Sequence, residues 1–222
     1  VDDCKAWIDS VTRKQGAFMV FSGDITREKA TELAEKLIVH LKDGAPPKAD
    51  YTLTDLPEPR RVILVDNPDG KQANIRMANR AFTNKSDEKF AGSILNRLLT
   101  QGTESRLNKY VRGEKGLSYG VGGIFDAGRH TGKFEGSTDT NPETVGASLD
   151  AMFKVFDDMK NEPVGDEELA EGKSRIIGGM ALGMQTIAQQ TGRRIDIILN
   201  GYPVDYLDAY PSRIKAVTAE AL

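Results

Sequence analysis

The sequence predicts an α+β domain in which helices pack on one face of a mostly antiparallel sheet. Two observations carry this prediction. Short apolar or alternating segments, typical of strands, lie close enough along the chain to form hairpins, and longer segments with helical spacing of apolar residues are grouped after them. With 222 residues, 39% of them hydrophobic, the chain is long enough to bury a core.

Composition argues against several classes of partner. The net charge is only -3, so neither nucleic acid nor an anionic membrane is expected to bind. Cys4 is the single cysteine, which rules out an intrachain disulfide and a thiolate zinc cluster. Because no stretch is long and apolar enough to span a bilayer, we expect a soluble protein.

The first elements are predicted to be a helix, a strand and a second helix. Residues 1–15 carry apolar side chains at helical spacing, residues 17–21 form an apolar run typical of a buried strand, and residues 27–42 repeat leucine at the spacing of a surface helix. Thr26 is the expected N-cap of the second helix. Residues 43–59 are rich in Pro and Asp without periodicity, which indicates a linker.

Most of the sheet is predicted in the middle of the chain. Residues 61–65 form another apolar run, a turn signal follows at 67–70, and residues 72–82 alternate, which together indicate a hairpin. Two more strands, 117–125 and 131–138, are indicated on either side of a glycine-containing turn.

Helices are predicted between and after these strands. One runs over 86–102, with a short one behind it, and an N-cap with a following proline at 141–142 begins another. The region 167–200 is helical in pattern but interrupted by glycines, so we expect two helices or a kink. Close packing is expected at the glycine pair 178–179.

Short catalytic patterns in the sequence are weak. His40 and His130 are ninety positions apart and lack metal-ligand spacing, so we expect both on the surface and no metal site in this chain. The segments 86–89 and 212–215 match the serine-lysine tetrapeptide of penicillin-recognising enzymes, but the companion motifs of that chemistry are missing. We interpret the first as a helix cap and the second as exposed helix.

A more specific signal is the segment 110–121, in which Arg112 and Tyr119 are seven positions apart. It resembles the stretch of pitrilysin/insulinase-type zinc peptidases, and of mitochondrial processing peptidases, in which an arginine-tyrosine pair binds substrate. The resemblance covers nearly the whole chain, because three other segments are similar in order and spacing to segments of that family: 18–24 (FMVFSGD), 62–75 and 95–107.

The resemblance implies a metallopeptidase half-domain. In this family two α+β halves enclose a peptide, and one half carries an inverted zinc motif, His-x-x-Glu-His, which this sequence lacks. No catalytic or metal-binding residue is therefore expected here, zinc is implied in a partner half or subunit, and the chain is expected to be inactive alone.

Arg112 and Tyr119 are the substrate-binding residues that the resemblance implies. A guanidinium and a phenol can donate hydrogen bonds to a peptide carbonyl and stabilise the negative charge that develops on it. Judged without the resemblance, the simpler interpretation is that Arg112 pairs with a neighbour such as Glu114 and that Tyr119 packs in the core.

The resemblance also implies domain boundaries. Residues 1–45 correspond to a strand-helix unit from the end of the preceding half-domain, 46–59 to a linker, and 60–222 to the second half-domain, truncated before its last strand-helix unit. We expect the unit at 16–42 to dock on the sheet of 60–222, either in the same chain or in a swapped dimer. An open sheet edge would otherwise invite aggregation.

Three functions are compatible with these observations. The presence of both Arg112 and Tyr119 favours the substrate-binding, non-catalytic part of a zinc peptidase, with a peptide and a zinc-bearing half or subunit as partners. The alternatives are a catalytically silent scaffold subunit of the same fold and a stand-alone peptide-binding module. The periplasm or cytoplasm of a bacterium is expected rather than the mitochondrion, and the peptide preference is left open.

Overall fold

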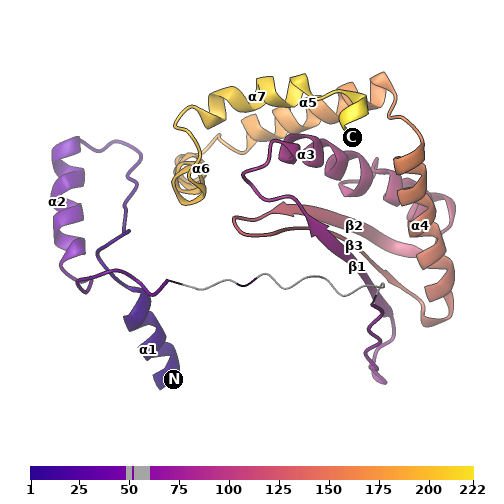
Figure 1. Ribbon diagram of the computed structural model, residues 1–222, viewed down its shortest axis with the longest axis horizontal. Coiled ribbons are helices and arrows are strands. Elements are labelled where there is room, and N and C mark those ends of the chain that lie inside the picture. The colour runs from indigo at the N-terminus through magenta and orange to yellow at the C-terminus, as the bar shows by residue number, and fades with distance from the viewer. Residues whose placement is uncertain (49–51, 53–60) are drawn as a thin grey trace. The chain divides into compact units, whose positions relative to one another are not determined.

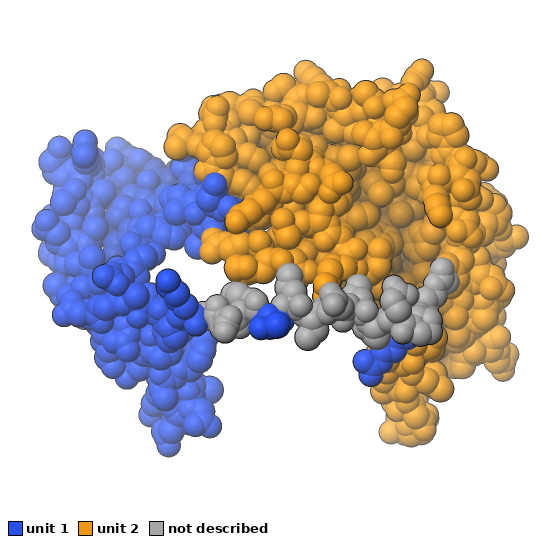
Figure 2. All heavy atoms as spheres, viewed as in Figure 1, with its two compact units in different colours: residues 1–61, 183–201 blue, residues 62–182, 202–222 orange. Residues whose placement is uncertain are grey.

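The computed structural model describes residues 1–48, 52 and 61–222. These fall into two compact units, one of residues 1–61 with 183–201 and one of residues 62–182 with 202–222 (Figure 2). Most of the expected linker lies outside the described residues. The expected domain boundaries, and the docking of 16–42 on the sheet, stay predictions.

A three-stranded antiparallel sheet forms the centre of the larger unit (Figure 1). Its strands are β1 (Ala73–Ala81), β2 (Ser118–Ala127) and β3 (Gly132–Thr140), in the order β1-β3-β2. β2 and β3 form the hairpin expected from the sequence, and β1 pairs antiparallel with β3. The predicted antiparallel α+β architecture is therefore confirmed.

The two faces of the sheet differ in polarity. Ile75 and Val121 both lie opposite Thr138, and all three residues are buried. Arg76 follows Ile75 on β1 and is exposed, and its guanidinium lies 2.6 Å from the Glu135 carboxylate. This alternation with a period of two is what a sheet with one covered face requires.

Helices cover the apolar face in two layers (Figure 1). α3 (Glu88–Thr100) packs against β2, and α4 (Val145–Asn161) contacts β1. α5 (Asp166–Leu182) and α7 (Tyr206–Ala216) pack on α3. The buried apolar residues form an inner cluster at the sheet, Ile75, Leu99, Leu107, Val111, Val121, Ala151, Met152 and Val155, and an outer cluster between helices, Phe90, Ile94, Leu98, Val164, Leu169 and Ile214.

The smaller unit contains α1 (Asp2–Val11), α2 (Arg27–Ile38) and α6 (Ile187–Asn200). α2 begins where the sequence predicts, because the Thr26 hydroxyl accepts a hydrogen bond of 3.2 Å from the Lys29 backbone N–H. None of these three helices contains a buried residue.

The region 167–200 forms two helices, as predicted, since α5 ends at Leu182 and α6 begins at Ile187. The prediction of close packing at the glycine pair 178–179 is wrong, because a Cβ built at either position would have no neighbour within 4 Å. The close contact occurs at Gly172, where a Cβ would lie 2.9 Å from Leu98 Cδ2. A sequence pattern shows where glycines are but not which of them face another helix.

Two predicted strands are absent from the structure. Residues 17–21 and 61–65 have no strand structure, and Val62 and Leu64 are 91% and 94% exposed. The predicted hairpin of 61–65 with 72–82 is therefore wrong, although its turn at 67–70 forms. An apolar run favours burial, but a strand also needs a neighbouring strand for its N–H and C=O groups, and for β1 that neighbour is β3.

Gly123 occupies a position on β2 that has no room for a side chain. A Cβ there would lie 2.4 Å from the Glu135 carbonyl oxygen and 2.8 Å from Thr100 Cγ2. We expect Gly123→Ala to lower the free energy of unfolding by about 1–3 kcal/mol, because β3 or α3 must move to make room for the added methyl group. Gly178→Ala is the matched control, which should raise it by about 0.5–1 kcal/mol at an exposed helical site. Urea unfolding followed by circular dichroism measures both, and equal effects would contradict the packing described.

Thr140 joins the end of β3 to its neighbours through one buried hydroxyl. Its Oγ1 donates to the Leu117 carbonyl oxygen at 2.7 Å and accepts from the Ser148 hydroxyl of α4 at 2.9 Å. Thr140→Val keeps the shape but leaves both partners without their bond, so we expect the free energy of unfolding to fall by about 1–3 kcal/mol. Thr131→Val, at an exposed site, should change it little. A loss no larger than that of the control would show that the hydroxyl contributes nothing.

Candidate functional site

Arg112 lies on a π-helix, Asn108–Glu114. The sequence predicts an ordinary short helix here, but the Lys115 backbone N–H donates to the Tyr110 carbonyl oxygen at 2.9 Å, five residues back instead of four. Val111 is fully buried in the inner cluster, which holds the segment against the core, and Arg112 beside it is exposed. Wide turns of this kind are rare in proteins as a whole. Those that do occur are often found at functional sites.

Tyr119 lies in a β-bulge at the start of β2. Ser118 pairs with Thr140 and Val121 pairs with Thr138, so three steps along β2 match two along β3. A bulge of this kind breaks the alternation of side chains and redirects one of them. Tyr119 is accordingly 87% exposed at the edge of a strand whose next paired residue, Val121, is buried.

The Ser118 hydroxyl closes the bulge. Its oxygen lies 2.7 Å from the carbonyl oxygens of both Gly120 and Asp139, and its single proton can be donated to one of them at a time. It also accepts a hydrogen bond of 3.1 Å from the Gly120 backbone N–H. The Thr138 hydroxyl donates to the Gly120 carbonyl from the neighbouring strand.

The structure brings Arg112 and Tyr119 together. The guanidinium carbon of Arg112 lies 5.1 Å from the centroid of the Tyr119 ring, a cation-π contact between two exposed side chains. The simpler interpretation, in which Arg112 pairs with Glu114 and Tyr119 packs in the core, is not found. Within the described ranges no salt bridge joins Arg112 to Glu114, and Tyr119 lies outside the core. The N–H donors of the guanidinium therefore stay open to a ligand.

Asn108 connects the π-helix to β2. Its side-chain amide donates to the Val121 carbonyl oxygen at 2.7 Å and to the Ser105 hydroxyl at 3.1 Å. Neither Asn108 nor Ser118 stands out in the sequence. Their partners are mostly backbone carbonyls, some of them on other elements, and no side-chain pattern in the sequence marks such partners.

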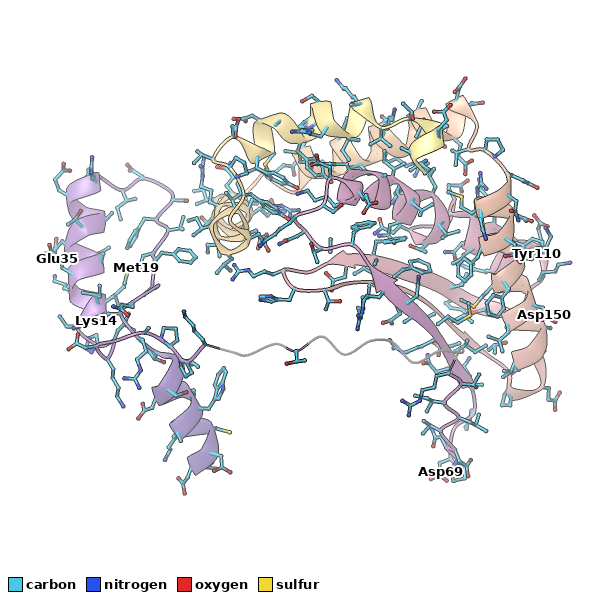
Figure 3. All side chains as sticks on the ribbon, in the orientation of Figure 1. Lys14, Met19, Glu35, Asp69, Tyr110 and Asp150 are labelled. Carbon is cyan, nitrogen blue, oxygen red and sulfur yellow. The ribbon has the colours of Figure 1, made fainter. Side chains whose placement is uncertain are left out.

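Two further contacts hold the π-helix from its other sides. The Arg106 guanidinium donates to both oxygens of Glu168 on α5, at 2.9 and 2.6 Å, and this hydrogen bonding raises the pKa of Arg106. Tyr110, labelled in Figure 3 beside α4, has the amines of Lys115 and Lys154 at 5.2 and 5.5 Å from its ring centroid. The segment is thereby tied to both α4 and α5.

A shallow depression of about 480 Å³ opens beside Arg112. It is lined by Thr103, Asn108, Lys109, Arg112, Gly113 and Glu114. Lys109, Arg112 and Glu114 bring charges of both signs to its rim. Arg112 lies where the π-helix approaches β2. Hydrogen-bond donors in this arrangement could bind a group that carries partial negative charge, and the residues that line the depression include no paired nucleophile and base.

The described residues do not fit a zinc ion. No group of three or more His, Cys, Asp or Glu side chains in that part of the chain could hold a metal. His40 and His130 are both exposed, as predicted. No helix in the described ranges is long and apolar enough to cross a membrane.

The segment 86–89 forms a helix start, as interpreted from the sequence. The Ser86 hydroxyl accepts a hydrogen bond of 3.2 Å from the Glu88 backbone N–H. The Lys89 amine donates to the Asn84 carbonyl oxygen at 2.7 Å. This hydrogen bond joins the first turn of α3 to the residues before it.

A relative named an uncharacterized zinc protease, from Mycobacterium bovis, is 24% identical over 133 residues, which is 60% of this chain and 30% of the relative. Among solved structures, the peptidase M16 inactive domain from Pseudomonas fluorescens matches with a TM-score of 0.75 and 21% identity, over 90% of this chain and 47% of that one. A protease from Helicobacter pylori matches with a TM-score of 0.79 and 16% identity, over 90% of this chain and 49% of that one.

The chain thus spans about half the length of these solved chains and less than a third of the curated relative. Residues 1–176 match the family model described as the peptidase M16 inactive domain. The resemblance to a family of zinc peptidases that the sequence suggests is confirmed, and with it the assignment to a half without the zinc motif. This chain belongs to the peptidase M16 family, within its inactive domain.

Proposed function

We propose that this chain is the substrate-binding part of a zinc-dependent peptidase, and that Arg112 and Tyr119 bind a backbone carbonyl of a peptide. The observation that carries the proposal is the contact of an exposed guanidinium with an exposed phenol, from two separate elements, in an inactive domain of this family. The proposed partner is a zinc-bearing half or subunit of the same family.

The chemistry of the pair suits a carbonyl oxygen. Arginine stays protonated at all physiological pH values and offers several donors in a fixed plane, and the tyrosine hydroxyl offers one more. Donors held in place strengthen their interaction as negative charge develops on the oxygen, because they need no rearrangement during the reaction. Stacking of the guanidinium on the Tyr119 ring also reduces the conformational freedom that Arg112 loses on binding.

The described residues include no cluster that could hold zinc, so zinc-dependent hydrolysis would need residues of a partner half or subunit. Binding of a carbonyl orients and polarises the peptide but breaks no bond. The chain alone is therefore proposed to be inactive, and its contribution to be measurable only when the zinc-bearing half is present.

The test is peptide hydrolysis by the zinc-bearing half mixed with this chain. Arg112→Ala is expected to lower kcat/KM roughly 10- to 100-fold, because it removes a charged hydrogen bond of about 1.5–3 kcal/mol. Tyr119→Phe removes only the hydroxyl and should cause a smaller loss. The urea midpoints of both variants should stay close to that of the wild type, since both side chains are exposed.

Arg193→Ala is the matched control, because Arg193 is exposed on α6, in the smaller unit. It should leave hydrolysis unchanged. If Arg112→Ala and Tyr119→Phe also left hydrolysis unchanged, the pair would have no part in substrate binding. A catalytically silent scaffold of the same fold would then be the better account of this chain.

A further inference from the structure

The pair must keep a fixed geometry although neither side chain is buried. Arg112 and Tyr119 are both exposed, so packing of their own atoms does not hold them. Binding residues need support from their surroundings to within a fraction of an ångström. The distance between the two side chains therefore depends on how the π-helix and the bulge are held by other residues.

Asn108 fixes the position of the π-helix along β2. It is one turn before Arg112 and donates to the carbonyl oxygen of Val121, two residues after Tyr119, at 2.7 Å. The second hydrogen of its amide is donated to Ser105 at 3.1 Å. Although Asn108 lines the depression, both donors of its amide are thus used inside the protein.

Ser118 holds the bulge that presents Tyr119. Its hydroxyl reaches across to β3 at Asp139 and also contacts both backbone groups of Gly120, the residue on the other side of Tyr119. Rotation of Tyr119 toward the inner face would require these hydrogen bonds to break. The two side chains of the pair are therefore each held by one polar residue on their own element.

We infer that Asn108 and Ser118 are positioning residues, which set the distance between Arg112 and Tyr119 without touching the substrate themselves. The effect of these residues on peptide binding rests on the proposed function, because it exists only if Arg112 and Tyr119 bind a peptide. The geometry itself can be measured without any peptide.

The first measurement is the position of the pair in solution. In NMR spectra of the whole chain, the side-chain protons of Arg112 should show an upfield ring-current shift from Tyr119, identified by its loss in Tyr119→Leu. Asn108→Leu, close in size but without an amide, and Ser118→Ala should each reduce this shift. Ser118→Thr keeps the hydroxyl and should restore it.

Ser93→Ala is the matched control. Ser93 also donates its hydroxyl to a backbone carbonyl, that of Lys89 on α3, and it is half-buried like Ser118. Its removal should leave the ring-current shift of Arg112 unchanged. A merely structural role of Ser118 would give the same result for both serines.

The second measurement is the affinity for a peptide, with a capped decapeptide of Ala, Ser and Thr as the probe. From a net hydrogen-bond contribution near 0.5–1.5 kcal/mol, Ser118→Ala and Asn108→Leu should each weaken binding roughly 2- to 10-fold. Arg112→Ala should weaken it further, because it removes a donor to the peptide itself. Ser118→Thr and Ser93→Ala should bind like the wild type.

The outcomes separate the two proposals. If Arg112→Ala weakens binding while Asn108→Leu and Ser118→Ala keep the ring-current shift and the affinity, the positioning role is overturned and the proposed function stands. If Arg112→Ala binds like the wild type, the proposed function is overturned, and the ring-current shift alone decides whether Asn108 and Ser118 hold the pair. Should Asn108→Leu not fold, the comparison of Ser118→Ala with Ser118→Thr decides.

Discussion

The pairing of β3 with both of its neighbours is the constraint on which the rest of the structure depends. β3 is the central strand, bonded to β1 on one side and to β2 on the other. Its inward residues leave room for α4, since a Cβ at Gly136 would lie 3.2 Å from the Phe156 ring and 3.4 Å from Met152. Its last residue, Thr140, is bonded to the chain just before the bulge and to α4. The position of Tyr119 is therefore tied to the core.

The candidate site consists of two departures from regular structure that lie side by side. A π-helix turns Arg112 out beside a buried valine, and a bulge turns Tyr119 out of a strand whose next paired residue is buried. The bulge breaks the hydrogen-bond pattern of β2, and the side chains of Asn108, Ser118 and Thr138 lie within hydrogen-bond distance of carbonyl oxygens there. Irregular backbone of this kind is frequent at functional sites.

The arrangement is consistent with the division of roles between two halves that we propose. The described residues provide donors for a carbonyl but no cluster of side chains that could hold zinc. One guanidinium and one phenol can bind and polarise a carbonyl group, and in the proposed function the zinc ion is held by a partner half or subunit. In the proposed function, substrate binding would lie in a domain whose described residues include no zinc site.

The sequence by itself determined the features that arise between neighbours along the chain. The Thr26 cap, the turn at 67–70 and the break within 167–200 each depend on groups a few residues apart. The proposed role of Arg112 and Tyr119 came from resemblance, and their spacing alone did not show that their side chains are in contact.

Only the tertiary structure decided which partners distant segments find. It paired β1 with β3 instead of with 61–65, left that apolar run exposed, and turned an expected short helix into a π-helix. The Arg112–Tyr119 contact depends in the same way on hydrogen bonds from Asn108 to β2 and from Ser118 to β3. Such partners lie thirteen and twenty-one residues away along the chain, beyond the reach of local periodicity, because a hydrogen bond to a backbone carbonyl leaves no mark in the identity of the residue that accepts it.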